Sequence, residues 1–481
     1  MKQTEWKIIY ASEGIIAQKA LQLLYKEAGQ HLIRESGVYR IYVLPCEKEG
    51  APFSKNTILM GLYKDSAEIA KFISPEEVPS DGFAVKIVEN PDCPEEGRIV
   101  ILTAHEEQEL FYAAVHFLDD YIPAYAPLHG SNPMPDLIYD SPLAPYFYSE
   151  QADHKRRSIF SWGHTISDYR AYIDNMARMK YNELILWNDF VPLNIRDVIE
   201  YAHSYGIRVF LGYAWGWKPR CRDIEELSSD YLSEIKQGII DAYRTIFLPL
   251  DCDGIYFQSF TEMKRANIGE RNIAETVVKL VNESAEALWD ITPDLKLIFG
   301  LHATSVRDQL HEIEKVDTRI EILWEDCGEF PYHYRPFVKD RDKFENNFDF
   351  VRKLLELRNG IGVGLVFKGM MVMDWKKFVP QAGPYVMGEN AKTIAEHDTG
   401  IRRNSWRIFS ASWMESCPDA LRMMQFINEH QKNEVFMNIA VNGDGGAYFP
   451  MALCGELFRK APESASSLLK KVAARPYVQL G

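Results

Sequence analysis

Carboxylates stand at the ends of two β-rich stretches of this sequence. The stretch DGIYFQSFTEM, residues 253–263, begins as an apolar strand and closes on Glu262. The stretch RIEILWEDCGEF, residues 319–330, carries Glu325 and Asp326 after its apolar part. An unpaired carboxylate is costly at the end of a buried strand, so such groups are solvated, paired or used in chemistry. Two carboxyl groups that face each other across a pocket can serve as general acid and as base or nucleophile.

Aromatic, amide and imidazole residues follow the other β-rich stretches. Flat aromatic rings pack against the C–H face of a sugar ring, and directed polar groups bind its hydroxyls. We therefore predict a carbohydrate pocket lined by Trp162, His164, Trp187, Asn188, Asp189, Tyr213, Trp215, Gln258, His302, Trp324 and Lys368. No HExxH or similar spacing is present, so we predict no metal site. No GxGxxG or P-loop follows a strand, so we predict no cofactor.

Each candidate also has a structural interpretation. Glu262 could be a solvated charge or an ion-pair partner at a strand end, and the pair Glu325–Asp326 could simply begin a loop. Trp215 could be packing in the core, and the histidines could be hydrogen-bonded loop residues. Asp251 and Asp253 precede their strand, and we expect them to cap the chain at the opposite end.

The elements that must position these residues repeat as strand–helix units. Eight β-rich segments, most of them followed by an amphipathic helical segment, predict a (β/α)₈ barrel over residues 156–450. The expected strands lie at 157–164, 182–190, 207–217, 254–262, 295–304, 319–330, 361–369 and 434–443. A doubly wound open sheet is the alternative. In a barrel the carboxyl ends of the strands carry the chemistry, and every candidate above falls at such an end.

Residues 1–125 predict a small α/β or α+β domain in front of the barrel. Short strands and helices alternate there, with strands expected at 6–12, 38–45, 56–63, 82–90 and 97–104 and helices at 17–29, 65–73 and 106–122. Residues 126–155 are rich in Pro and turn formers and read as a linker. Residues 451–481 are expected to form a C-terminal helical segment.

Composition narrows the class of protein. The chain has 481 residues, 46% of them hydrophobic and 26% charged, which is ordinary for a globular protein with a large core. Its net charge of −15, without a basic patch, argues against nucleic acid and anionic membranes as partners. The seven cysteines are scattered without a CxxC pair, which disfavours a disulfide framework. No signal-like or membrane-spanning apolar run occurs, so we expect a cytoplasmic protein, although a secreted mature form would read the same way.

Several of these segments resemble glycoside hydrolases. RIVILTAHEEQELFYAAVHFLDDYI is similar to the strand–helix unit that closes the small domain in family 20 hexosaminidases and family 67 α-glucuronidases. RSIFSWGHTISDYRAYIDNMARMKYNELILWND resembles the start of their barrels, and GIYFQSFTEM resembles the α-glucuronidase strand that ends on the general acid. The resemblance implies that Glu262 is the acid and that Glu325 is the second carboxylate.

Two positions depart from those families. Thr261 stands where family 20 enzymes have the Asp that orients the acetamido group of the substrate. His302 and Thr304 stand where the α-glucuronidases have an Asp. The resemblance therefore does not carry over acetamide-assisted catalysis or a uronate substrate.

The sequence thus predicts a glycoside hydrolase in which Glu262 is the acid and Glu325, with Asp326, the base or nucleophile. A carbohydrate-binding protein on a degenerate barrel and a lyase or aldolase using Lys368 are the alternatives. The sequence leaves open the sugar, the linkage, exo or endo action, retention or inversion, any extension beyond Gly481 and the oligomeric state, a homodimer included.

Overall fold

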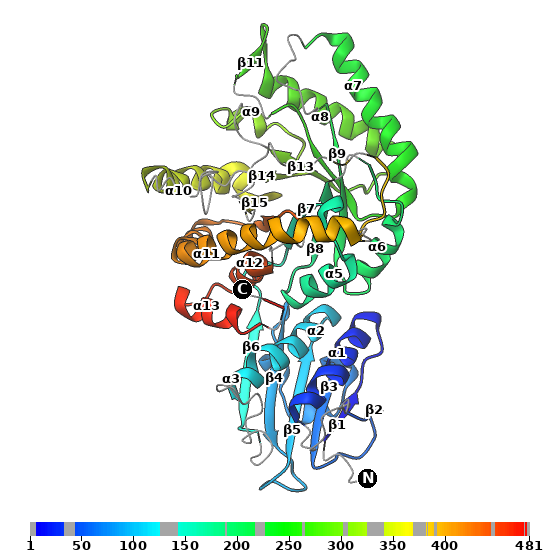
Figure 1. The fold of residues 1–481 in the computed structure, drawn as a ribbon, viewed down its shortest axis with the longest axis vertical. Helices are drawn as coiled ribbons and strands as arrows, with labels where there is room; N and C mark the ends of the chain where they lie inside the picture. Colours follow the sequence, from blue (N-terminus) through cyan, green and yellow to red (C-terminus); the bar gives the residue numbers. More distant parts are fainter. Residues whose placement is uncertain are drawn as a thin grey trace. The chain divides into compact units, whose positions relative to one another are not determined.

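The computed structural model describes most of the chain. The described residues are 6–32, 44–125, 143–187, 190–216, 227–261, 265–301, 306–324, 341–368, 381, 383–388, 392–443, 448–475 and 477–478. They form two compact units, one made mainly of residues up to Ala152 and a second that begins at Asp153. Figure 1 shows the helices and strands of both units.

The first unit is a six-stranded mixed sheet in the order β2-β1-β3-β5-β4-β6. Its strands are β1 (Trp6–Tyr10), β2 (Cys46–Lys48), β3 (Asn56–Leu62), β4 (Gly82–Glu89), β5 (Arg98–Ala104) and β6 (Tyr146–Gln151). Strands β2, β1, β3 and β5 run parallel, while β4 is antiparallel to both β5 and β6. Its helices are α1 (Ile15–Leu32), α2 (Glu107–His116) and α3 (Ile122–Tyr125), with a π-helical turn, Phe117–Tyr121, between the last two.

Two segments of this unit differ from the sequence expectations, and a third lies mostly outside the described residues. The segment 65–73 forms short 3₁₀ turns, Tyr63–Asp65 and Ile69–Lys71, instead of a helix, because Ile69 and Ile73 bury themselves against the sheet beside Leu59 and Ile99. Residues 146–151, inside the expected linker, form the edge strand β6. Most of the strand expected at 38–45 lies outside the described residues.

The second unit is a closed barrel of eight parallel strands, as predicted. The strands are β7 (Arg157–Trp162), β8 (Glu183–Trp187), β9 (Arg208–Ala214), β10 (Gly254–Gln258), β13 (Leu297–Leu301), β14 (Ile320–Trp324), β15 (Val363–Lys368) and β16 (Phe436–Ala440). The pairing of β16 with β7 closes the ring and excludes the open-sheet alternative. The two short strands β11 (Asn267–Ile268) and β12 (Arg271–Asn272) form a separate hairpin.

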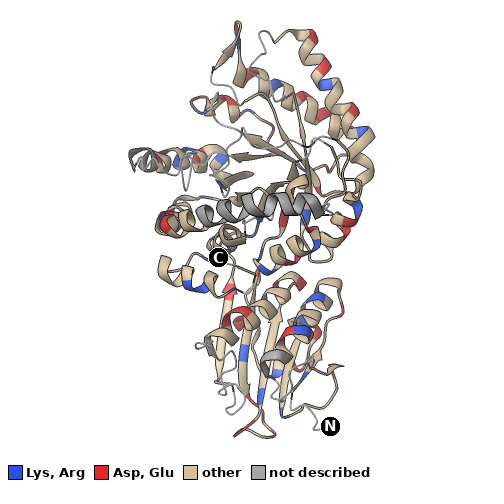
Figure 2. Cartoon of the chain, in the orientation of Figure 1, with Lys and Arg blue, Asp and Glu red and all other residues tan. Residues whose placement is uncertain are grey.

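Helices follow most of the barrel strands. They are α5 (Tyr169–Arg178), α6 (Ile195–His203), α7 (Ser229–Ala242), α8 (Ile273–Trp289), α9 (Leu310–Ile313), α10 (Arg341–Glu356), α11 (Lys392–His430), α12 (Tyr448–Arg459) and α13 (Ala465–Ala473). Side-chain caps define three of the starts: Asp168 accepts hydrogen bonds at α5, Ser228 at α7 and Asn272 at α8. A capping oxygen satisfies an N–H that the first helical turn leaves without a partner. Both α7 and α8 carry acidic residues together with a lysine (Figure 2).

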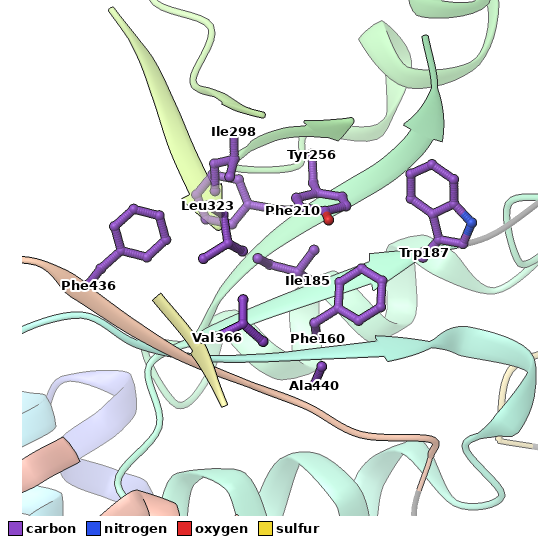
Figure 3. Packing of buried hydrophobic residues seen from close by; sticks show 10 residues of the cluster. All are labelled: Phe160, Ile185, Trp187, Phe210, Tyr256, Ile298, Leu323, Val366, Phe436 and Ala440. Atoms are coloured by element: carbon purple, nitrogen blue, oxygen red, sulfur yellow. The ribbon is translucent and has the colours of Figure 1, made fainter. Parts of the chain in front are cut away.

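Side chains from all eight strands fill the barrel interior (Figure 3). The cluster comprises Phe160, Ile185, Trp187, Phe210, Tyr256, Ile298, Leu323, Val366, Phe436 and Ala440. Two glycines make room for its aromatic members. A Cβ on Gly212 would lie 2.7 Å from the Trp187 ring, and one on Gly300 would overlap the Tyr256 hydroxyl. The barrel is therefore a packed core rather than a channel.

An ion network occupies the amino-terminal end of the barrel. Arg156 donates from Nε to Glu183 (2.6 Å) and from Nη2 to Glu321 (2.8 Å), and Arg208 also pairs with Glu183. The Glu183 side chain is completely buried. Burial acts to lower the pKa of Arg156, but the two carboxylates outweigh it and hold that pKa above its ordinary value. Arg156 also lies over the Phe436 ring at 4.3 Å.

Within the described residues no helix combines the length and the apolar character that crossing a membrane requires.

Candidate functional site

Four of the predicted binding residues lie on the inward side of the barrel at its carboxyl-terminal end. Trp162 and Trp187 are register partners on β7 and β8 and belong to, or pack against, the interior cluster. Gln258 and Lys368 stand two residues after the interior residues Tyr256 and Val366, and strand side chains alternate between faces, so both lie on the inward side. The structure thus groups two indoles, an amide and an amine at the end where barrel enzymes carry their chemistry.

The two tryptophans contact aromatic rings of the barrel interior. The Trp162 ring meets Phe160 edge-on at 5.3 Å, and the Trp187 ring meets Tyr256 edge-on at 5.9 Å. Phe160 and Tyr256 also contact each other at 5.3 Å. Trp162 keeps more exposed surface than Trp187. The rings of Phe160 and Tyr256 therefore support both indoles, and such contacts hold a stacking surface in position before a ligand binds.

The segment that follows β10 is tightly bound to the loop after β9. The Gln258 carbonyl accepts from the Trp215 N–H (2.8 Å), and Ser259 Oγ donates to the Trp215 carbonyl (2.9 Å). Phe260 and Thr261 are buried. Gln258 also donates from Nε2 to the Tyr256 hydroxyl (2.9 Å), so its amide is oriented. Residues 258–261, immediately before position 262 in the sequence, are thus held by hydrogen bonds and burial.

Three other predicted residues point away from the barrel interior. Tyr213 stacks on Phe247 at 4.5 Å and donates to the Ile239 carbonyl of α7, and burial raises the pKa of its phenol. Trp215 stacks on Phe257 at 3.6 Å.

Trp324 contacts Phe350 of α10 edge-on at 5.3 Å. The indoles of Trp215 and Trp324 are fully buried. These two and Tyr213 pack between strands and helices. They therefore do not face the barrel interior, where the predicted carbohydrate pocket would lie.

His164 lies in the 3₁₀ turn after β7, Gly163–Thr165, and its ring meets that of Tyr385 edge-on at 6.4 Å. The remaining predicted residues lie outside the described residues. They are the three proposed catalytic carboxylates, Glu262, Glu325 and Asp326, and the binding residues Asn188, Asp189 and His302. Their roles stay predictions.

Sequence reasoning missed Asn442, which follows β16. Among the described residues its Oδ1 has no hydrogen-bond partner, although that atom is screened from solvent. The next residue, Gly443, donates to Ser161 Oγ (2.8 Å), which ties this segment to β7. An acceptor without a partner next to the barrel end is suited to a substrate hydroxyl. An amide after a β-rich segment was the signal used for Asn188, and the same signal was present in EVFMNIAVNG.

Asp253 lies at the opposite end, as expected for a residue that precedes its strand. Its carboxylate accepts from the Val209 N–H and pairs with His203 Nε2, both at 2.7 Å. No group of three or more His, Cys, Asp or Glu side chains suited to a metal ion occurs in the described parts of the chain.

Together, the closed barrel and the sheet domain before it define a fold class found among glycoside hydrolases. Solved structures similar to this chain include a family GH115 4-O-methyl-α-glucuronidase with specificity for decorated arabinogalactans, at a TM-score of 0.53 and 10% identity over 97% of this chain. A GH138 enzyme targeting pectin rhamnogalacturonan II matches 97% of it at a TM-score of 0.50 and 10% identity. A β-hexosaminidase from Streptomyces plicatus matches 97% of it at a TM-score of 0.50 and 11% identity.

The chain spans 59% of the α-glucuronidase, 52% of the GH138 enzyme and 89% of the hexosaminidase. No protein-family model matches the sequence, and no curated protein matches it. At this level of identity the likeness shows the fold: a (β/α)₈ barrel preceded by a small α/β domain. The predicted resemblance to hexosaminidases is confirmed for the fold.

Proposed function

We propose that this protein is a glycoside hydrolase. The observation that carries the proposal is that the likeness to glycosidases extends over 97% of the chain, so it takes in the small first domain as well as the barrel. Barrels serve many chemistries, and a barrel by itself would say little about function. The inward-facing Trp162, Trp187 and Gln258 at the carboxyl-terminal end add groups that suit a sugar ring.

In the proposed mechanism Glu262 protonates the leaving oxygen. Glu262 directly follows residues 258–261, which are buried and hydrogen-bonded to the loop after β9. A positioned acid of this kind typically contributes a factor of about 10²–10⁴ to the rate. Thr261 in place of an acetamide-orienting Asp favours a mechanism that draws its second carboxylate from the protein.

Glu325 is our choice for that second carboxylate, in preference to Asp326. Glu325 follows Glu321 by four residues, the spacing that separates the inward-facing Glu183 and Trp187 on β8. An even spacing along a strand keeps two side chains on one face. Asp326 has the opposite phase. Asn442 and Lys368 would bind hydroxyl groups beside this pair.

The test is hydrolysis of a panel of aryl glycosides by the wild type, Glu262→Gln and Glu325→Gln. We expect Glu262→Gln to lower kcat by about 10²–10⁴ on substrates with poor leaving groups and much less on those with good ones, because a good leaving group needs no proton. Added azide should rescue a Glu325→Gln variant if that residue is a nucleophile. Glu321→Gln is the matched control, since Glu321 pairs with Arg156 at the other barrel end.

Full activity of Glu262→Gln on a poor leaving group would contradict the assignment of the acid. Saturable glycan binding by calorimetry without any product would instead support a carbohydrate-binding protein on a degenerate barrel.

Lys368 supports a second candidate, a lyase or aldolase. Lys368 is 7% exposed at the carboxyl-terminal end of β15. A buried lysine is what Schiff-base chemistry requires. Borohydride reduction in the presence of a carbonyl substrate would leave a covalent adduct on Lys368 if this candidate holds, and no adduct if the protein is a hydrolase. The cytoplasmic location stays a prediction.

A further inference from the structure

Two segments far apart in sequence form one hydrogen-bonded surface in the barrel unit. Residues 190–194 lie between β8 and α6, and residues 381–388 precede α11. The Leu193 N–H donates to the Tyr385 carbonyl (2.9 Å), and the Phe190 N–H donates to Gln381 Oε1 (3.3 Å). Asn194 makes two bonds with the Met387 backbone, at 2.9 and 3.0 Å. We call the side chains of Phe190, Leu193 and Val386 on these segments the rim surface.

The rim surface is apolar and open to solvent. Phe190 is 45% exposed, Leu193 73% and Val386 36%, and they are three of the ten large hydrophobic side chains exposed in the described part of the chain. The stretches 190–194 and 381–388 contain no charged residue, in a chain of which 26% is charged. A group of exposed apolar side chains on a soluble protein marks a binding surface more often than a scattered one does.

The rim surface is also firmly built. Met387 is completely buried, and Gly388 packs so closely against Tyr169 that a Cβ would come within 2.5 Å of its backbone nitrogen. The backbone beside Leu193 and Val386 is therefore held by hydrogen bonds and close packing while their side chains remain exposed.

The position of the rim surface connects it to the proposed active site. Phe190 follows Trp187 by three residues, so the surface lies on a loop at the carboxyl-terminal end of the barrel. Tyr385, between the two segments, meets His164 edge-on, and His164 lies two residues after Trp162. Through Tyr385 and His164 the rim surface is thus linked to the turn that follows Trp162, one of the two tryptophans that we propose to hold the sugar.

We propose that the rim surface binds an apolar aglycone, an alkyl or aryl group attached to the sugar that is cleaved. Leu193 and Val386 are branched and offer no flat face for a pyranose ring, and sugar hydroxyls placed against them would lose hydrogen bonds to water. A hydrocarbon group gains free energy in proportion to the apolar area it buries there. This proposal rests on the proposed glycosidase function.

The experiment compares methyl and octyl glycosides of the sugar that the enzyme cleaves, both below the micelle concentration. Methanol and octanol are leaving groups of similar basicity. The ratio of the kcat/KM values of the two glycosides therefore reports binding of the octyl group. We expect octyl to exceed methyl by at least about tenfold in the wild type, because burying two methylene groups accounts for that factor. The double variant Leu193→Ser and Val386→Ser should reduce the ratio to about twofold.

Ile361→Ser is the matched control. Ile361 is 59% exposed but lies just before β15, at the amino-terminal end of the barrel, and its replacement should leave the octyl-to-methyl ratio unchanged. An equal ratio in the wild type and the double variant would overturn the inference while leaving the hydrolase intact. If no glycoside in the panel is cleaved, the proposed function fails, and calorimetry of octyl against methyl glycoside on the same variants decides the rim surface: equal affinities overturn it, and octyl preference lost in the double variant supports it.

Discussion

The two ends of the barrel use charged and aromatic residues in opposite ways. At the amino-terminal end Glu183 and Glu321 form ion pairs, and Arg156 donates hydrogen bonds to both carboxylates. At the carboxyl-terminal end the inward-facing side chains include Trp162 and Trp187, with polar groups beside them. Both ends belong to the same strands and obey the same alternation. The difference teaches that a carboxylate in this barrel can be assigned a role only after its end of the strand is known.

Carboxylates that stabilise the barrel and carboxylates that take part in catalysis need different surroundings. A buried carboxylate without a partner is costly, so those at the amino-terminal end have partners that stabilise the closed ring. A catalytic carboxylate must exchange a proton during the reaction, which a permanent arginine partner would oppose by lowering its pKa. We therefore expect equivalent substitutions at the two ends to have opposite effects on stability and on catalysis.

The largest effect is expected for Glu183→Gln. Its side chain is completely buried and pairs with Arg156 and Arg208, so the variant leaves two guanidinium groups short of a counter-charge. We expect the free energy of unfolding of the barrel to fall by about 3 kcal/mol, with kcat unchanged. Urea unfolding and steady-state kinetics measure the two quantities, and Glu262→Gln should show the reverse pattern.

The control for this prediction is Glu283→Gln. Glu283 pairs with Lys236 at 3.4 Å on the surface, and its loss should change stability by less than about 0.5 kcal/mol. Equal destabilisation by the two substitutions would show that the Glu183 network does not stabilise the barrel as proposed.

A smaller effect distinguishes Asn442 from an asparagine with a structural role. Asn442 Oδ1 lacks a partner within the described residues, so Asn442→Ala should keep stability or raise it by up to about 1 kcal/mol while raising KM. Asn90 is the comparison, because its amide makes three bonds, to the carbonyls of Ser54 and Lys55 and from the Asp92 N–H. Asn90→Ala should cost about 1–2 kcal/mol.

Thermal unfolding and Michaelis kinetics test this contrast. If Asn442→Ala were as destabilising as Asn90→Ala, with KM unchanged, Asn442 would have a structural role and no role in binding.

The smallest effect concerns pH at the amino-terminal end. The hydrogen bond to Asp253 raises the pKa of His203 above its ordinary 6.5. Burial acts to raise the pKa of Asp253, but the bonds from His203 and the Val209 N–H outweigh it and hold that pKa below 3.8. The stabilisation from His203 is complete below pH 6.5 and is lost as pH rises through its raised pKa. That from Asp253 is complete above pH 3.8 and is lost as pH falls through its lowered pKa.

The pair should therefore stabilise the barrel most between about pH 4 and 6.5, by less than about 1 kcal/mol because both groups are partly exposed. The melting temperature of His203→Gln should fall further below that of the wild type at pH 5.5 than at pH 9. A difference that is constant with pH would show that the pair contributes no charge-dependent stability.

Much of the architecture follows from the sequence. The β-rich stretches, their regular spacing and the helical segments between them predict eight strands. In the structure each strand begins within two residues of its expected start, but several end earlier than expected, β14 at Trp324 and β10 at Gln258. The closure of the ring did not follow from the pattern, because an open sheet has the same strand–helix units. Only the pairing of β16 with β7 decided it. The helix expected at 65–73 failed because packing against the sheet outweighed its helical spacing.

The pentapeptides ELILW of β8 and IEILW of β14 show where sequence ends and tertiary structure begins. Each has a glutamate near its start and a tryptophan at its end, and from the sequence both tryptophans are candidates for the site. In the structure both glutamates face inward to Arg156. Trp187 lies four residues after its glutamate and shares its face, whereas Trp324 lies three residues after its own and packs outward on Phe350. The sequence determined the spacing. The tertiary structure decided which face each tryptophan takes, because both glutamates face inward and side chains alternate along a strand.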